Sequence, residues 1–205
     1  MITRDLQGLP KRDVYRILSS LVIPRPIAWI TTLDVDGLVN LAPFSSFMGI
    51  FGPPMLAVTL ARRKDGSLKD THRNLRDSGE AVVHLADQAL LPALHASGDD
   101  VDPQVSEVAR LGLATAPSDV VRAPRLVLAP VALECRLNRE IELSSASTLV
   151  LLDVLRTHAA DPIWDEVNDC ADASRWSPVM RLASVAGPNY GVLGETLRLE
   201  APKLP

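Results

Sequence analysis

The sequence has few aromatic residues, few cysteines and no long apolar run. Aromatic side chains make up 4% of the 205 residues, so aliphatic side chains must supply most of the core. Cys135 and Cys170 are the two thiols. They form no close pair, which argues against a disulfide framework and against a zinc site. The formal net charge of −4 argues against a general nucleic-acid binder.

Targeting signals are missing as well. The first residues, Met1–Leu6, lack the cationic stretch and apolar core of a secretory signal. No segment approaches the roughly 20 apolar residues that cross a bilayer. We therefore expect a cytoplasmic protein without a membrane segment. A chain of this length buries roughly 70% of its unfolded surface, which suits one domain over residues 1–205.

Several familiar catalytic patterns are absent too. No GxGxxG motif follows a strand and opens a helix, so a dedicated Rossmann domain for a nicotinamide cofactor is not expected. The acidic cluster Asp99, Asp100 and Asp102 lacks EF-hand spacing. The histidines also lack metal-ligand spacing, and they are His72, His84, His95 and His158. We therefore predict no metal site.

A hairpin is the first feature that is clearly present. Residues 27–33 are rich in β-branched and aromatic side chains, and a second apolar strand is predicted over residues 38–42. The intervening Asp36-Gly37 is a strong hairpin signal, because glycine readily adopts a positive φ. We expect the chain to leave the second strand at Pro43 and to present Ser45 and Ser46 between two phenylalanines. Such a loop can hydrogen-bond and stack at once.

A basic turn and a short helix follow the next strand, which is predicted over residues 55–60. The helix is predicted over residues 68–76, with Lys69, Asp70 or Thr71 at its start and Gly79 after its end. The start of a helix carries partial positive charge, so a phosphate could bind there with Arg62, Arg63 or Lys69 as the counter-charge. The alternative is a solvated turn before an ordinary capped helix.

The remaining segments predict further strands and helices. Residues 11–21 have a helical apolar period, and we expect this helix to pack across one end of the fold. Short helices are predicted over residues 88–96 and 106–113. Strands are predicted over 80–85, 127–143 and 147–157, with alternation typical of a sheet that buries one face.

Taken together, the segments PRPIAW, N-LAPFS-F, PP and KDT-RN between Pro24 and Asn74 resemble the flavin reductase-like family. The resemblance is strong over residues 24–85, looser over 130–135 and 149–158, and fades in the tail. It implies a mainly β fold, an antiparallel split β-barrel with short peripheral helices. It also implies a homodimer and non-covalently bound FMN, with FAD as an alternative.

The resemblance assigns site residues by their positions in the matching segments. It implies that Thr31 and Thr32 lie along the flavin and its ribityl chain. The segment expected at the isoalloxazine edge contains Asn40, Ala42, Ser45, Ser46 and Phe47. The segment expected at the phosphate contains Lys69, Asp70, Thr71 and Asn74.

Two further residues are implied near the reacting ring. His158 ends a predicted strand where the family often carries histidine, which suggests a catalytic role on the nicotinamide or substrate side of the flavin. The alternative is an ordinary hydrogen-bonded surface histidine. Tyr190 is expected to reach the flavin from a partner subunit. The segment Met48–Gly52 is more apolar than in relatives, which indicates a hydrophobic substrate pocket or a subunit contact.

Three functions follow from this resemblance. The first is an NAD(P)H-dependent flavin reductase that passes electrons to free flavin, oxygen or a partner monooxygenase. The second is a flavoredoxin-like electron-transfer protein without its own nicotinamide site. The third is a non-catalytic split-barrel module. A flavin carries its own reactivity, so the lack of a catalytic triad does not decide among them.

Overall fold

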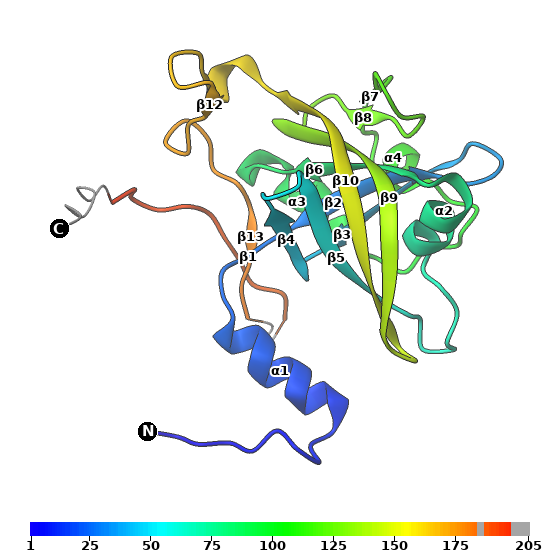
Figure 1. Ribbon diagram of the computed structural model, residues 1–205, viewed down its shortest axis with the longest axis vertical. Helices are drawn as coiled ribbons and strands as arrows, with labels where there is room; N and C mark the ends of the chain where they lie inside the picture. The colour runs from blue at the N-terminus through cyan, green and yellow to red at the C-terminus, as the bar shows by residue number, and fades with distance from the viewer. Residues whose placement is uncertain (184–186, 198–205) are drawn as a thin grey trace.

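A seven-stranded antiparallel sheet, curled on itself, forms the centre of the computed structural model, which describes residues 1–183 and 187–197 (Figure 1). The strand order is β3-β2-β6-β9-β10-β5-β4, so β3 and β4 are the two edges. The strands are β2 (Ala28–Leu33), β3 (Val39–Phe44), β4 (Phe47–Ile50), β5 (Met55–Ala61), β6 (Glu80–Leu85), β9 (Val131–Ser144) and β10 (Ser147–Ala159). The predicted mainly β, antiparallel fold is therefore confirmed.

The predicted hairpin joins β2 and β3. Thr31 pairs with Leu41, and Gly37 in the turn has a φ of +86°, a conformation that side chains with a Cβ rarely adopt. The prediction that the chain leaves the strand at Pro43 is wrong, because Pro43 pairs with Trp29 inside β3. Proline lacks a ladder donor, but an edge strand such as β3 needs donors on one side only.

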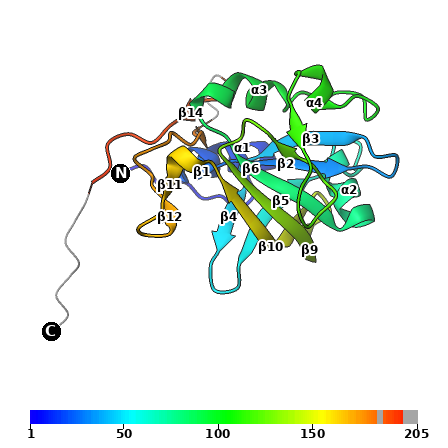
Figure 2. The same cartoon turned by 90° about the horizontal axis from the view of Figure 1, so that it is seen from above.

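The outer side of β3 is covered by α4 (Glu107–Arg110) and its flanking serine. Ser106 Oγ donates to the Val39 carbonyl at 2.6 Å, and the Leu41 amide donates to the Glu107 carboxylate at 2.9 Å. These bonds satisfy backbone groups that an uncovered edge would expose to another strand. Figure 2 shows α4 and α3 (Leu91–Ala96) on the same side of the molecule as β3.

Aliphatic side chains fill the barrel, as the low aromatic content requires. Ile30, Val58, Leu60 and Leu152 are fully buried there. A second apolar cluster lies on the other face of β2 around Trp29, whose Nε1 donates to Ser97 Oγ at 2.8 Å. The sheet therefore buries both faces of β2.

Two longer helices lie outside the sheet. The predicted helix α2 (Asp70–Ser78) ends at Gly79, which has a φ of +71° and donates its amide to the Leu75 carbonyl. Helix α1 (Lys11–Leu21) also forms as predicted. The expectation that α1 packs across one end of the barrel is wrong, since Figure 1 shows it projecting away from the sheet. Its side chains Tyr15 and Leu21 are 56% and 72% exposed.

Short elements complete the described chain. They are β1 (Arg25–Pro26), η1 (Gln88–Leu90), β7 (Thr115–Ala116), β8 (Arg125–Leu126), η2 (Asp161–Ile163), β11 (Trp164–Asp165), β12 (Cys170–Ala171), β13 (Met180–Arg181) and β14 (Tyr190–Gly191). Strand β13 pairs with both β1 and β14. Within residues 1–183 and 187–197, no helix is long and apolar enough to cross a membrane.

Candidate functional site

A cleft of about 520 Å³ lies between the start of α2, the edge strand β3 and the loop at residues 97–101. This volume is in the range of small-molecule sites. The cleft is lined by Asn40, Ala42, Pro43, Arg62, Arg63, Lys64, Asp65, Lys69, Asp70, Thr71, Ser97, Gly98, Asp99, Asp100, Val101 and Glu107. It therefore brings together residues predicted for the phosphate end and for the ring edge of a flavin.

The start of α2 is open to a ligand. Lys69 occupies the N-cap position as predicted, but no side chain caps the helix. The Lys69 carbonyl accepts the amides of His72 and Arg73, which begins the helical bonding pattern. The amides of the first turn before them have no intrahelical acceptor and carry partial positive charge. An anion is the natural partner for such a helix start.

Cationic side chains surround this helix start. Arg62, Lys64 and Lys69 line the cleft, and none has an ion pair within the described part of the chain. The Lys69 ammonium lies 5.8 Å from the centre of the Phe44 ring. Three cations beside free helix amides can bind a phosphate dianion.

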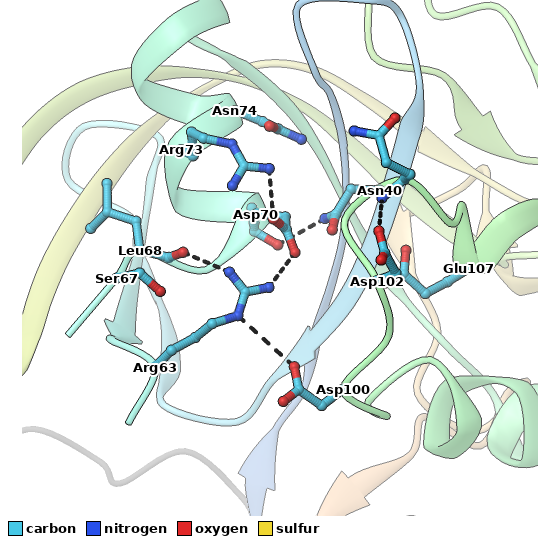
Figure 3. Close-up of polar contacts among 12 residues, drawn as sticks. Asn40, Arg63, Ser67, Leu68, Asp70, Arg73, Asn74, Asp100, Asp102 and Glu107 are labelled. Atoms are coloured by element: carbon cyan, nitrogen blue, oxygen red, sulfur yellow. Dashed lines mark hydrogen bonds and ion pairs between the residues drawn. The ribbon is translucent and has the colours of Figure 1, made fainter. Parts of the chain in front are cut away.

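The Asp70 side chain forms ion pairs with two arginines at the start of α2. Its carboxylate lies between Arg63 and Arg73, with the Arg73 guanidinium at 2.6 Å (Figure 3). Burial alone would raise the pKa of Asp70, but the hydrogen bonds and charges of the two arginines lower it. The carboxylate is therefore ionised and occupied. Asp70 can still offer its backbone amide to a ligand.

Four predicted residues from three elements form one polar network. The Asn40 side-chain amide donates to Thr71 Oγ1 at 2.9 Å, and the Asn74 amide donates to Thr32 Oγ1 at 3.1 Å. Asn40 also approaches Thr32 Oγ1 at 3.4 Å. The network connects β2, β3 and α2 at the cleft wall.

One acceptor in this network has no donor. Asn74 is 1% exposed, and its Oδ1 has no hydrogen-bond partner among the residues that the structure describes. Asn74 lines a cavity of about 10 Å³, which it shares with Asn40, Asp70 and Glu107. A cavity of this size holds about one water molecule. The unpaired oxygen can therefore accept a hydrogen bond from a water in this cavity. That water can also bond to a hydroxyl group in the cleft.

Sequence reasoning missed Glu107, which lines both the cleft and this small cavity. It is 6% exposed and accepts the Leu41 amide. Burial raises its pKa, against the lowering effect of that hydrogen bond. A glutamate directly after a helix N-cap serine looks like a solvated first-turn residue, so the sequence carried no signal for its burial.

A second hollow of about 290 Å³ continues the cleft at the end away from α2, sharing Pro43, Gly98 and Asp99 with it. Ser45 lines this hollow, together with a cluster of three longer side chains. The members of that cluster are His95, Arg181 and Tyr190. The cleft and this hollow together extend from the start of α2 to Tyr190.

Tyr190 is held firmly in the hollow of its own chain. His95 Nδ1 and Tyr190 Oη lie 3.0 Å apart, and the two rings meet edge to face with centroids 5.8 Å apart. The Arg181 guanidinium carbon lies 5.0 Å from the centre of the Tyr190 ring. Residues 184–186, a few positions before Tyr190, lie outside the described residues.

Three other predicted residues do not line the cleft. Thr31 is buried on the opposite face of β2 from Thr32, and its Oγ1 donates to the Pro124 carbonyl at 2.7 Å. Ser46 is exposed, with its carbonyl accepting the Thr59 amide. Phe47 packs against the barrel interior.

The structure also places His158 away from the cleft. Ser147, at the start of β10, pairs with Ala61 next to the basic turn, whereas His158 lies at the other end of this long strand. His158 Nε2 lies 2.6 Å from Glu134 Oε1. The Glu134 carboxylate is completely buried and also accepts the amides of Asp119 and Val120. His158 thus completes the hydrogen bonding of a buried carboxylate.

Asp119, Glu134 and His158 form the one group that could hold a metal within the described residues, with ligand atoms within 4.8 Å of one another. The 2.6 Å separation of His158 Nε2 and Glu134 Oε1 is a hydrogen-bond distance. Two ligands on one zinc ion at about 2.0–2.2 Å each would stand farther apart. Asp119 is moreover engaged by Arg156 at 2.7 Å. The geometry is that of a hydrogen-bonded cluster.

The antiparallel barrel has a cationic helix start in its cleft, and this arrangement suits a small anionic ligand. Residues 19–167 match the profile of the flavin reductase like domain. The chain is also 36% identical over 203 residues to the protein BH2278 of Halalkalibacterium halodurans, covering 96% of this chain and 95% of that one. The chain belongs to the flavin reductase-like family.

Solved structures agree with this assignment. Nitrilotriacetate monooxygenase component B from Bacillus cereus superposes with a TM-score of 0.90 at 32% identity, covering 97% of this chain and 98% of that chain. The 2-nitrobenzoate 2-nitroreductase NbaA of Pseudomonas fluorescens gives 0.89 at 29% identity, with coverages of 100% and 98%. A flavin reductase with a split barrel domain from Shewanella frigidimarina superposes with a TM-score of 0.79 at 18% identity, covering 95% of each chain, which confirms the predicted split-barrel fold.

Proposed function

We propose that this protein is an oxidoreductase that binds FMN non-covalently in the cleft and takes electrons from NADH or NADPH. The observation that carries the proposal is that the cationic start of α2 and two members of the polar network, Asn40 and Thr71, line the same cleft. Behind these two side chains, Thr32 accepts hydrogen bonds from Asn40 and Asn74. A bound flavin would supply the redox chemistry itself. The protein then has to bind and orient it and exclude water.

Each part of the cleft suits one part of FMN. The phosphate would bind the amides of Asp70 and Thr71 and the side chains of Arg62 and Lys69. The ribityl hydroxyls can both donate and accept, so they match Asn40, Thr71 and, through the small cavity, the unpaired Asn74 oxygen. The ring would extend past Ala42 and Pro43 to Ser45.

The remaining predicted contacts take weaker roles in this proposal. Ser46 and Phe47 follow Ser45 directly, so their backbone groups are the parts that can approach the ring edge. Thr31 would support the site by fixing β2 to the loop at Pro124. His158 stays a proposed active-site residue only if a partner subunit brings it to the flavin.

The hollow around His95 and Tyr190 is the place for the nicotinamide or the electron acceptor. It adjoins the region proposed for the ring and offers a phenol and an imidazole. The likeness to a monooxygenase component B supports delivery of reduced flavin to a partner monooxygenase. The likeness to a nitroreductase supports direct reduction of an organic acceptor as the second candidate.

We also propose that the protein acts as a homodimer in the cytoplasm. Helix α1 exposes Tyr15, Leu18 and Leu21, and the β4–β5 turn exposes Phe51 by 93%. Apolar groups gathered on protruding elements are typical of subunit contacts. Met48–Gly52 was expected to form either a hydrophobic substrate pocket or a subunit contact. We favour the subunit contact, because these residues do not line the cleft.

FMN binding by paired variants tests the site. Lys69→Ala/Thr71→Ala should weaken FMN binding by at least about tenfold, measured by quenching of flavin fluorescence, because it removes a cation and a network hydroxyl. Thr3→Ala/Lys11→Ala changes the same residue types on an exposed segment and is the matched control. Unaltered affinity in the first variant would refute the phosphate assignment. No binding of FMN or FAD to the unmodified protein would refute the function.

A further inference from the structure

The net charge of the lining residues changes from positive to negative just beyond the end of the cleft that we propose for the phosphate. Arg63 and Asp100 form the boundary, with Arg63 Nε 3.9 Å from the Asp100 carboxylate (Figure 3). Beyond them an open hollow of about 770 Å³ shares Arg63, Asp65, Asp100 and Val101 with the cleft. It is also lined by Ser67, Leu68, Arg73, Asp102 and Pro103. This outer hollow has room for a second nucleotide half.

The two arginines that line the outer hollow already share an acidic partner outside it. Arg63 and Arg73 both bind Asp70, so the three together leave one positive charge for the three carboxylates of Asp65, Asp100 and Asp102. Asp65 and Asp102 have no ion pair in the described part of the chain. Hydrogen bonds from Ser67 lower the pKa of Asp65 and keep it ionised. The outer hollow is therefore net negative.

On the cleft side of the boundary, positive charge exceeds negative charge. Arg62, Lys64 and Lys69 reach it without ion-pair partners among the described residues, and the start of α2 adds partial positive charge. Three carboxylates line the cleft but not the outer hollow. Asp70 is bound by Arg63 and Arg73, Asp99 is paired with Arg110, and burial raises the pKa of Glu107. One phosphate can thus be neutralised inside the boundary, whereas a second phosphate outside it would face carboxylates.

We propose that Asp65, Asp100 and Asp102 make this cleft selective for flavin mononucleotide over flavin adenine dinucleotide. The inference rests on the proposed function, namely that the cleft binds a flavin with its phosphate at α2. The outer hollow is large enough for the adenylate half, so the discrimination is electrostatic and not steric. Exposed charges at several ångströms interact modestly, which predicts a preference of about tenfold at low salt.

The test compares the affinities of FMN, FAD and riboflavin for the flavin-free protein by fluorescence quenching. The unmodified protein should bind FMN about tenfold more tightly than FAD. Asp100→Asn/Asp102→Asn should narrow this ratio by about fivefold, because FAD should gain more affinity than FMN. Both residues lie on an exposed or half-exposed loop, so the variant should fold.

A matched control separates a local effect from a change in net charge. Glu166→Gln/Asp169→Asn also removes two carboxylates, but from the exposed β11–β12 turn, and it should leave the ratio unchanged. High salt should reduce the ratio in the unmodified protein, because the screening length is about 3 Å at 1 M.

The outcomes distinguish this inference from the proposed function. Equal affinities for FMN and FAD, or a ratio that the Asp100/Asp102 variant does not narrow, would overturn the inference while leaving flavin binding intact. Riboflavin binding more weakly than FMN would support the phosphate position on which the inference depends. No binding of any of the three flavins would overturn the proposed function itself.

Discussion

His84 shows at the scale of one residue how burial fixes a protonation state. The ring is fully buried, with Nδ1 2.9 Å from the Trp29 carbonyl and Nε2 3.0 Å from the Leu126 amide, which donates to it. Nε2 must therefore be unprotonated, and Nδ1 donates to Trp29. Burial, the largest cause, lowers the pKa of His84 from 6.5 to about 4.

This state predicts a loss of stability in acid. Between pH 6.5 and pH 4 the unfolded chain takes up a proton on His84 that the folded chain does not. The free energy of unfolding should therefore fall across this window, by at most about 3 kcal/mol from this group. Denaturant unfolding at several pH values should show a weaker pH dependence in His84→Gln. An equal dependence in both proteins would contradict the assignment.

The two cysteines should differ sharply in reactivity. Burial raises the pKa of the Cys135 thiol to about 12, whereas Cys170 is exposed. A disulfide reagent such as Ellman's reagent should therefore modify one thiol in the folded protein and two in denaturant. Cys170→Ser should abolish the reaction of the folded protein. Rapid modification of Cys135 in that variant would show that the barrel opens far more readily than its packing implies.

A variant of His158 distinguishes a structural role of this residue from a catalytic one. His158→Ala should lower the free energy of unfolding by about 1–3 kcal/mol, because the buried Glu134 carboxylate loses a hydrogen bond. FMN affinity and turnover should stay unchanged, since His158 lies away from the cleft. Reduced turnover with unchanged stability would instead support the catalytic role that the family resemblance implies.

At the scale of elements, the end of α2 depends on a glycine. Gly79 has a φ of +71°, and a Cβ there would meet no atom within 4 Å. Gly79→Ala should therefore cost about 1 kcal/mol through backbone strain alone. Gly52 also has open space around it but no positive φ, so Gly52→Ala is the control and should be nearly neutral. Equal unfolding midpoints for both variants would contradict this explanation.

The elements were largely predictable because their signals are local. The Asp36-Gly37 turn, the alternating strands and the start and end of α2 are fixed by neighbours along the chain. The side chains of the site were less predictable. Strand β2 is buried on both faces, so polarity alone could not show that Thr32 faces the network and Thr31 faces Pro124.

Long-range packing decided the other differences. The burial of Glu107 depends on α4 covering β3, and the position of His158 depends on the pairing along β10. The position of α1 depends on what its apolar stripe contacts, and an amphipathic pattern does not say whether that partner belongs to the same chain. The family resemblance supplied the residues proposed for the phosphate, for the ribityl chain and for the ring. Of these, Asn40, Ala42, Lys69, Asp70 and Thr71 line the cleft, and Ser45 lines the adjoining hollow.

At the scale of the whole molecule, the exposed stripe of α1 predicts a dimer. Light scattering coupled to size-exclusion chromatography should give about twice the chain mass of 22.2 kDa. Leu18→Ser/Leu21→Ser should shift the population toward monomer, because apolar area would be lost from the contact. Val35→Ser, at the 81% exposed tip of the β2–β3 hairpin, is the control. A monomeric unmodified protein would contradict the proposal.

The single-domain organisation over residues 1–205 stays a prediction.

Electron transfer through a bound flavin is the central claim, and one spectroscopic titration tests it most directly. Purified protein loaded with FMN is mixed anaerobically with NADH, and separately with NADPH, while flavin absorbance is followed. At least one reductant should bleach the bound flavin much faster than it bleaches free FMN. Tight FMN binding without bleaching by either reductant would contradict the reductase function and favour an electron-transfer protein without a nicotinamide site.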